Sequence, residues 1–232
     1  MARSSAMDGK YIAIEGNIGA GKTTLAMFLQ ERYGADLVLE HPEENPFLRR
    51  FYRDMRTYAF QTQLYFLLSR YEQQRKLLQV DLFKRCVVSD YLFAKEWIFA
   101  SVNLTDEELS LYHKIIPLLE TNLPVPDLVV YLQASTPVLL ERIRRRGRAW
   151  ERNVQKEYIE ELNEEYNRFF FRYERTALLV VNVEGVNFVQ HEEDLEDIAL
   201  QIETMEERVT RYYVPTGMRT SQPMLEEDRR VR

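Results

Sequence analysis

The stretch EGNIGAGKTT, residues 15–24, decides the fold of this 232-residue chain. Residues 16–23 match the pattern G-x-x-x-x-G-K-[ST], in which glycines allow a loop to curl around phosphate groups. The stretch follows the apolar run YIAIE (Tyr11–Glu15), which predicts a buried strand, and it opens a predicted helix over Thr23–Tyr33. This order of strand, loop and helix is the context that a phosphate-binding loop requires.

The loop predicts a site for a nucleoside triphosphate. Successive backbone N–H groups point inward at phosphate oxygens, and the start of the helix adds partial positive charge. We expect Lys22 to reach the β- and γ-phosphates and the Thr23 hydroxyl group to ligate Mg²⁺. The predicted nucleotide-binding set is Gly16, Asn17, Ile18, Gly19, Ala20, Gly21, Lys22, Thr23 and Thr24.

The rest of the chain alternates apolar runs with helical segments. Further strands are predicted at 36–40, 86–90, 127–133 and 177–183, and further helices at 58–80, from 105 onwards, 136–146, 158–173 and 194–209. Strands that are apolar throughout and separated by helices predict an α/β fold whose parallel sheet of five strands is covered on both faces. We therefore expect a leader at 1–9, one domain at 10–209 and a charged tail at 210–232.

Composition excludes several classes of function. A formal net charge of −6 gives nucleic acid no general electrostatic attraction, so we expect no nucleic-acid partner. No apolar run approaches membrane-spanning length, so no membrane partner is expected either. Cys86 is the only cysteine, which rules out an internal disulfide and is typical of the cytoplasm. The histidines lack the spacing of metal ligands.

An arginine-rich segment favours a small kinase among the classes that bind nucleoside triphosphates. The chain contains no N-K-x-D and no D-x-x-G motif, which argues against a GTPase. ERIRRRGRAWE (Glu141–Glu151) crowds arginines around Gly147, and guanidinium groups match the oxygens of a transferring phosphoryl group. We interpret this segment, at about 142–152, as a mobile lid; a solvated face or a nucleic-acid-binding face is the alternative.

Two acids end predicted strands, where open parallel sheets bind their ligands. Glu40 ends the second strand and could accept a proton from an attacking hydroxyl group, but Glu43 and Glu44 follow so closely that the residues alone do not choose between them. Asp90 ends the third strand, where an acid commonly supports Mg²⁺ through water. For both Glu40 and Asp90, a helix cap or a surface charge is the alternative.

Two polar residues on the long predicted helix are candidates for contact with a ligand. Gln63 and Arg70 are seven residues apart and share a face. A glutamine offers a donor and an acceptor side by side, which suits the edge of a nucleobase. Taken alone, an exposed polar stripe explains the pair more simply.

These motifs occur in the order seen in deoxynucleoside kinases, and residues 10–205 resemble that family. The shared stretches are GNIGAGKTT, LE at Glu40, FY at Phe51-Tyr52, YAFQTQLYFLLSR (Tyr58–Arg70), SDY (Ser89–Tyr91) and ERIRRRGR. Among its members, the bacterial deoxyguanosine and deoxyadenosine kinases are most similar. The resemblance implies a P-loop kinase fold, commonly a homodimer, that transfers the γ-phosphate of ATP to the 5′-hydroxyl group of a deoxyribonucleoside in nucleotide salvage. It also implies Mg²⁺ as cofactor and a purine as the preferred base.

The resemblance assigns roles by position. Glu40 would be the general base, assisted by Lys22 and Arg148, and Asp90 would lie near the metal and the 5′-hydroxyl group. The other implied contacts are Tyr52 to the sugar 3′-hydroxyl group, Gln63 and Arg70 to the base, Glu96 (or, one residue earlier, Lys95) in the base pocket, Arg142, Arg146 and Arg148 in the lid over ATP, and Asn187-Phe188 in the adenine-binding loop.

The sequence departs from the family pattern at two places. Tyr91 follows Asp90 where many members have arginine, so one charge that contacts phosphate or hydroxyl is missing. Asn167 stands where a later helix often carries a glutamate for the sugar. Two other functions remain open. One is a thymidylate-type nucleoside monophosphate kinase, which would use the cations Arg49, Arg50 and Arg53. The other is a nucleotide-binding subunit without catalysis.

Overall fold

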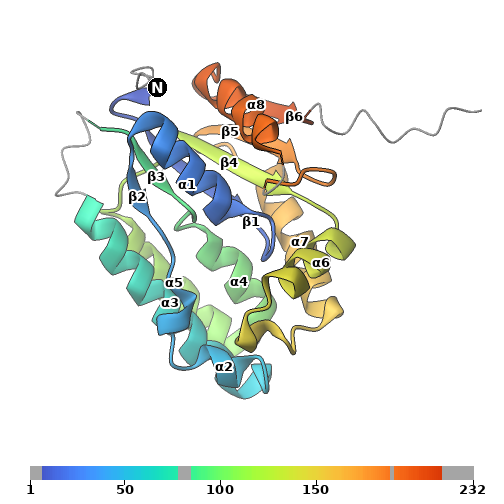
Figure 1. Cartoon of the computed structure of the whole chain (residues 1–232). Coiled ribbons are helices and arrows are strands. Elements are labelled where there is room, and N and C mark those ends of the chain that lie inside the picture. Colours follow the sequence, from blue (N-terminus) through green and yellow to red (C-terminus); the bar gives the residue numbers. More distant parts are fainter. Residues whose placement is uncertain (1–6, 78–84, 189–190, 216–232) are drawn as a thin grey trace, which may run out of the picture.

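One parallel sheet organises the chain, and the computed structural model describes residues 7–77, 85–188 and 191–215 (Figure 1). Six strands lie in the order β2-β3-β1-β4-β5-β6. They are β1 (Tyr11–Gly16), β2 (Asp36–Val38), β3 (Val87–Ser89), β4 (Leu128–Gln133), β5 (Ala177–Asn182) and β6 (Thr210–Tyr213). The five predicted strands are all present, and the prediction of an α/β fold with a parallel sheet is confirmed.

Helices cover both faces of this sheet. They are α1 (Lys22–Tyr33), α2 (Leu48–Phe51), α3 (Met55–Leu77), α4 (Lys95–Asn103), α5 (Asp106–Glu120), α6 (Thr136–Arg146), α7 (Lys156–Phe171) and α8 (Glu192–Glu203), with 3₁₀ turns at Pro42–Glu44 and Ala149–Glu151. Helices α1 and α8 pack together over the sheet, whereas α4 packs between α3 and α7 on its other side (Figure 1). Among the described residues, no helix combines the length and the apolar character needed to cross a bilayer.

The core is continuous through the sheet because its central strands are apolar on both sides. Strand β1 is buried at every position, and Ile12 pairs with Val88 of β3 and with Leu128 of β4. On the α7 side, Tyr131 of β4 stacks on Phe170 with 4.3 Å between the ring centroids. Such side chains, buried on both faces, are what a parallel sheet requires.

Strand β6, helix α4 and the short helix α2 were not predicted. Strand β6 lies in the segment assigned to the tail and pairs in parallel with β5, from Leu178–Thr210 to Val181–Tyr213. Its sequence TRYY mixes charge with aromatic residues, because it is an edge strand that is half exposed. Helix α4 was also missed, and its first residue lies within the polar site described below. Part of the predicted helix end near residue 80, and most of the predicted leader and tail, lie outside the described residues.

Candidate active site

The phosphate-binding loop takes a shape that side chains would prevent. Gly21 has a φ of +103°, and a Cβ atom on it would lie 2.6 Å from the ring of Phe188. Gly21 is also the N-cap of α1, and no side chain caps the helix there. The first N–H groups of the helix are therefore available to an anion. Gly16, Asn17 and Ala20 are buried and shape the loop, for example through the 2.7 Å bond from the Ile18 N–H group to Asn17 Oδ1.

Lys22 and Thr23 link the loop to the ends of the neighbouring strands. The Lys22 ammonium group donates to the carbonyl oxygens of Gly16 (2.8 Å) and Asn17 (3.2 Å). Burial and the positive charge of Lys95 lower the pKa of Lys22 to about 8. The Thr23 hydroxyl group donates to Asp90 Oδ2 at 2.7 Å.

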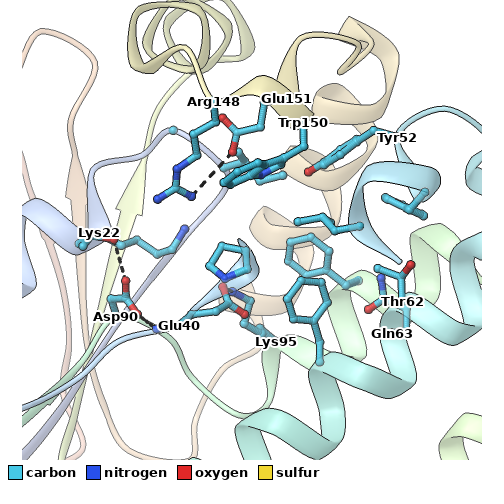
Figure 2. Close-up of a pocket in the computed structure, with 18 of the residues that line it drawn as sticks. Lys22, Glu40, Tyr52, Thr62, Gln63, Asp90, Lys95, Arg148, Trp150 and Glu151 are labelled. Atoms are coloured by element: carbon cyan, nitrogen blue, oxygen red, sulfur yellow. Dashed lines mark hydrogen bonds and ion pairs between the residues drawn. The ribbon is translucent and has the colours of Figure 1, made fainter. Parts of the chain in front are cut away.

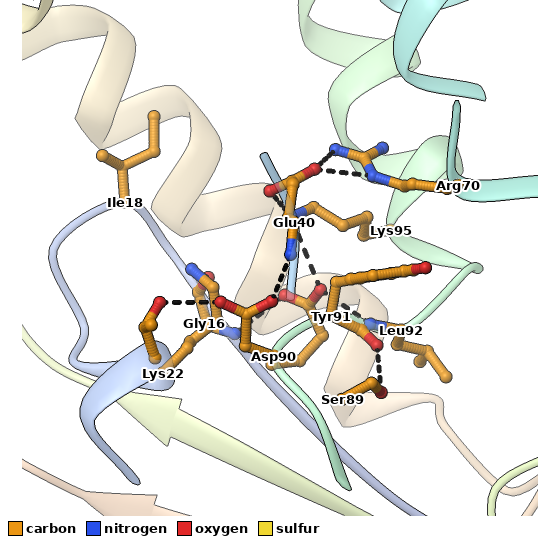
Figure 3. Close-up of polar contacts among 12 residues, drawn as sticks. Gly16, Ile18, Lys22, Glu40, Arg70, Ser89, Asp90, Tyr91, Leu92 and Lys95 are labelled. Atoms are coloured by element: carbon orange, nitrogen blue, oxygen red, sulfur yellow. Dashed lines mark hydrogen bonds and ion pairs between the residues drawn. The ribbon is translucent and has the colours of Figure 1, made fainter. Parts of the chain in front are cut away.

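Asp90 and Glu40 meet beside this loop, at the ends of β3 and β2. The backbone N–H group of Glu40 donates to Asp90 Oδ1 at 2.8 Å, so Asp90 lies between the loop and Glu40 (Figure 3). Burial raises the pKa of Asp90, and the hydrogen bond from Thr23 opposes that rise. The two strand-end acids are thus held in one polar unit with the phosphate-binding loop.

The Glu40 carboxylate is held by two cations from different helices. Arg70 of α3 donates to Oε1 through Nε at 2.7 Å and through Nη2, and Lys95 of α4 donates to Oε2 at 3.2 Å. Burial alone would raise the pKa of Glu40, but the charges of Arg70 and Lys95 outweigh it and hold the pKa well below its usual range. Glu43 and Glu44 are exposed and do not line the cavity, so geometry selects Glu40 among the three acids.

A cavity with about 790 Å³ of empty space, part of it open to solvent, extends from Glu40 towards α3. Its lining includes Ile18, Glu40, Tyr52, Gln63, Phe66, Arg70, Asp90, Lys95, Phe99, Trp150 and Glu151. Thr62 and Gln63 lie at the end away from Lys22 (Figure 2). Their buried atoms Oγ1 and Oε1 have no hydrogen-bond partner among the described residues, which marks that end as a place for a ligand with donor groups.

Glu96 lies behind this cavity rather than in its wall. It is fully buried, its Oε1 pairs with Arg70 Nη1, and its Oε2 accepts a bond from the Tyr112 hydroxyl group. Arg70 therefore joins Glu96 to Glu40. Of the two neighbouring candidates, Lys95 lines the cavity and points to Glu40, whereas Glu96 pairs with Arg70 and does not line the cavity.

The arginine-rich segment contributes one residue that the sequence analysis missed. Glu151 is 6 % exposed, lines the cavity, and accepts bonds from Arg146 Nη2 (2.7 Å) and Nε (3.2 Å). Figure 2 shows it near Tyr52 and Trp150. A single acid closing a run of arginines was the signal that could have identified it.

Asn167, which stands where many members of the family carry a glutamate for the sugar, lies away from the cavity. Its Oδ1 accepts bonds from the Tyr131 hydroxyl group at 2.9 Å and from Gln133 Nε2 at 2.6 Å, and Asn167 does not line the cavity. From the lid, Glu151 adds a third acid to the cavity lining, beside Glu40 and Asp90.

Arg142 contacts the phosphate-binding loop through the carbonyl oxygen of Ala20 at 3.5 Å, and Arg148 extends towards the same loop (Figure 2). Arg142 donates to the carbonyl oxygens of Val183 (2.6 Å) and Val186 (2.8 Å), and it thereby holds the segment that leads to Asn187 and Phe188. Arg148 lies over the Trp150 ring, 5.6 Å from its centroid, and extends towards Lys22 (Figure 2).

A second, open cleft of about 1410 Å³ lies on the other side of the phosphate-binding loop. Its lining is Gly19, Gly21, Lys22, Thr23, Thr24, Arg142, Arg145, Arg146, Arg148, Val186, Asn187 and Phe188. The cavity and the cleft share Gly19, Lys22, Thr23, Arg146 and Arg148. The site thus has two compartments that meet where the loop, the lid and a buried carboxylate converge.

Comparisons with known proteins agree with this geometry. Residues 12–207 match the family model described as deoxynucleoside kinase. The chain is 36% identical to a deoxyguanosine kinase of Bacillus subtilis over 84% of this chain and 97% of that protein, and 33% identical to a deoxyadenosine kinase of Dictyostelium discoideum over 88% and 83%. A solved structure of deoxyadenosine kinase from M. mycoides with bound dATP superposes with a TM-score of 0.71 at 25% identity, covering 84% of this chain and all of that one.

Proposed function

The chain belongs to the deoxynucleoside kinase family, and we propose that it transfers the γ-phosphoryl group of ATP to the 5′-hydroxyl group of a purine deoxyribonucleoside. The observation that carries this proposal is the junction of the two compartments at Lys22, Thr23 and the lid arginines. ATP would occupy the cleft beside Phe188 with its γ-phosphate at the junction. The nucleoside would occupy the cavity with its 5′-hydroxyl group beside Glu40.

The far end of the cavity would bind the base. Thr62 Oγ1 and Gln63 Oε1 have no hydrogen-bond partner in the part of the chain that the structure describes, and the amino or ring N–H groups of a purine would supply donors. Phe66 and Phe99 offer apolar surface to a flat ring. The names of the relatives, deoxyguanosine kinase and deoxyadenosine kinase, support a purine. An analogue without the matching donors would leave buried groups unpaired, which is a strong basis for rejection.

The sugar would be held between α2 and the lid. The Tyr52 side chain and Glu151 both line the cavity, and we propose that they bind the 3′-hydroxyl group together. Because Glu151 is anchored by Arg146, binding of the sugar would also fix the lid over the phosphates. The bound 3′-hydroxyl group would thereby help to order the lid arginines that act on ATP.

In the transfer step, we propose that Glu40 removes the proton of the 5′-hydroxyl group as its oxygen attacks the γ-phosphorus. Its depressed pKa keeps the carboxylate ionised, so its oxygens carry no proton before the reaction, but it also makes Glu40 a weaker base than an unpaired carboxylate. Lys22, Arg146 and Arg148 would stabilise the charge on the phosphoryl oxygens, as in other kinases. The Glu40 side chain is only 18 % exposed, so most of its surface is shielded from solvent.

Thr23 and Asp90 fit the expected Mg²⁺ ion. A hydroxyl oxygen and a carboxylate oxygen are ligand types that Mg²⁺ prefers, and the two side chains are in contact at 2.7 Å. Within the described ranges, no group of three or more histidine, cysteine or acidic side chains could enclose a metal. An ion that keeps several waters and binds phosphate oxygens needs no such group. When bound, it would neutralise charge on the β- and γ-phosphates.

The position of three arginines disfavours a nucleoside monophosphate kinase. Arg49, Arg50 and Arg53 are exposed, and none lines the acceptor cavity. The cavity cation Arg70 is instead paired with Glu40 and with the buried Glu96. A matched panel of deoxynucleosides and their monophosphates with ATP, read out as ADP release, tests the proposal. ADP release with monophosphates alone would overturn it.

We further propose that the enzyme acts in nucleotide salvage in the cytoplasm, as a homodimer. The family membership and the single cysteine support the setting, and the family resemblance supports the dimer. Light scattering during size-exclusion chromatography tests the dimer, since a monomer mass at assay concentration would contradict it.

A further inference from the structure

Lys95 places a buried ammonium group at the acceptor side of the reaction. It is the first residue of α4, its side chain is 3 % exposed, and it lines the acceptor cavity. Its Nζ atom lies 3.2 Å from Glu40 Oε2, 3.8 Å from Glu15 Oε1, and 5.3 Å from the centroid of the Phe99 ring. Burial of an ammonium group is costly, so its position needs an explanation.

The neighbouring carboxylates are well supplied with other donors. Glu15 accepts bonds from the N–H groups of Gly16 (2.8 Å) and Leu92 (3.1 Å) and from the Tyr166 hydroxyl group (2.9 Å). Glu40 accepts two bonds from Arg70. The need to neutralise Glu15 and Glu40 therefore does not fully explain why the Lys95 ammonium group is buried here.

Lys95 and Lys22 face the same gap between the phosphate-binding loop and Glu40. Both line the acceptor cavity, and Figure 2 shows them on either side of Glu40 and Asp90. Glu40 and Asp90 offset the mutual repulsion of these two ammonium groups in the free protein. In the proposed reaction a phosphoryl group passes through the same gap, within reach of both cations.

Among the described residues between β3 and α4, no side chain carries a positive charge. Tyr91, directly after Asp90, donates its hydroxyl group to Gln73 Oε1 at 2.9 Å and so points away from the loop. Lys95 reaches Glu40 from the start of the next helix. The cation that the sequence lacks after Asp90 is therefore present, but it comes from α4.

We propose that Lys95 is a catalytic residue that hydrogen-bonds Glu40 in the free enzyme and binds the phosphoryl group as it reaches the acceptor. This inference rests on the proposed kinase function. The 5′-oxygen forms a bond to the γ-phosphorus, the bond from that phosphorus to the β,γ-bridging oxygen breaks, and its electron pair leaves on ADP. The hydroxyl proton goes to Glu40. Protonation weakens the Lys95–Glu40 pair just as the acceptor gains a charged phosphate, so the ammonium group exchanges one anion for the other and keeps its own protons.

The test compares binding of a nucleoside with binding of its 5′-monophosphate. Lys95→Met, Lys95→Gln, Lys95→Arg and the exposed control Lys114→Met are titrated calorimetrically with the preferred deoxynucleoside and with its 5′-monophosphate, and kcat is measured with ATP. For Lys95→Met we expect kcat to fall about 100-fold, as when one charge-stabilising donor is removed. Monophosphate affinity should fall about tenfold, nucleoside affinity should change less than threefold, and Lys95→Arg should restore part of both losses.

A purely structural role would give a different pattern. Equal losses of nucleoside and monophosphate affinity, or an unchanged kcat in Lys95→Met, would overturn the inference. If the methionine variant does not fold, as judged by circular dichroism, the comparison of Lys95→Gln with Lys95→Arg decides by the same ratios. Wild-type protein that phosphorylates no deoxynucleoside would instead refute the proposed function, before any Lys95 variant is compared.

Discussion

Replacing Glu40 by glutamine tests the site at its centre, because the change removes a charge and a proton acceptor but keeps the shape. The variant cannot take the proton of the 5′-hydroxyl group. Loss of a general base typically costs 10²–10⁴ in rate, so we expect kcat to fall about 1000-fold, or about 4 kcal/mol in activation free energy. ATP binding should change less than twofold, since Glu40 does not line the nucleotide cleft.

The same substitution should also lower the free energy of unfolding. Breaking a buried ion pair costs about 3–5 kcal/mol when the remaining charge is left alone. Here Arg70 keeps Glu96, Lys95 keeps Glu15 at 3.8 Å, and the new amide oxygen can still accept a bond. We therefore expect a loss of only about 2 kcal/mol at neutral pH, which is about 4–8 °C in Tm for a chain of this size.

The pH dependence of this difference follows from the depressed pKa of Glu40. A carboxylate with a lowered folded-state pKa contributes stability above its unfolded pKa, and that contribution disappears as pH falls towards the folded value. The wild type should therefore lose its stability advantage over Glu40→Gln progressively as the pH falls below about 5. Single-turnover ADP formation, calorimetry with ATP and thermal melts at pH 7 and pH 4 measure the three effects.

The matched control is Glu43→Gln, which changes an exposed acid three residues away that is outside the cavity. It should retain wild-type rate and Tm. Wild-type transfer by Glu40→Gln would refute the assignment of the general base. A 1000-fold loss in Glu43→Gln would show that the wrong acid had been chosen.

Three further outcomes are expected. Glu151→Gln should raise KM for the deoxynucleoside about tenfold to a hundredfold, because it weakens a charged hydrogen bond to the sugar. Steady-state kinetics measure this, with Glu141→Gln as control, and a loss in ATP affinity alone would contradict a role at the sugar. Because the pKa of Lys22 is lowered to about 8, its ammonium group loses its charge as the pH rises. ATP affinity measured by calorimetry should therefore fall from pH 7 to pH 9 in the wild type but not in Lys22→Met. An equal pH dependence of ATP affinity in both proteins would refute this. Gly21→Ala should weaken ATP binding at least tenfold, because Gly21 has a φ of +103° and a Cβ atom would approach Phe188 to 2.6 Å. The double variant Gly21→Ala with Phe188→Ala should recover only part of the lost ATP affinity. Complete recovery would show that the contact, and not backbone strain, is responsible.

The parts of the site that follow from local pattern were predictable from the sequence. The loop at Gly16–Thr23 carries its own conformational signal, and Glu40 and Asp90 follow apolar runs whose ends must meet in a parallel sheet. The nucleotide site was likewise predictable, because it follows from the order of strand, loop and helix along the chain. These inferences needed no knowledge of how helices pack.

The remaining parts depend on contacts between elements that are distant in sequence. Arg70 joins Glu40 to Glu96 only because α3, β2 and α4 converge, and no spacing rule encodes that convergence. Glu151 returns to Arg146 because the chain reverses at Gly147, which has a φ of +68°. The sequence analysis matched these arginines to a transferring phosphoryl group, whereas in the free protein Arg146 pairs with an acid of the same chain, Glu151.

Strand β6 makes completion of the sheet a late event in synthesis. Because β5 and β6 run parallel, the chain must pass through α8 before Thr210 can pair with Leu178. On the ribosome, that pairing waits until Tyr213 has left the exit tunnel, long after the phosphate-binding loop has emerged. The edge of β5 is bare throughout that interval, and a nascent chain with a bare strand edge is a natural client for a chaperone.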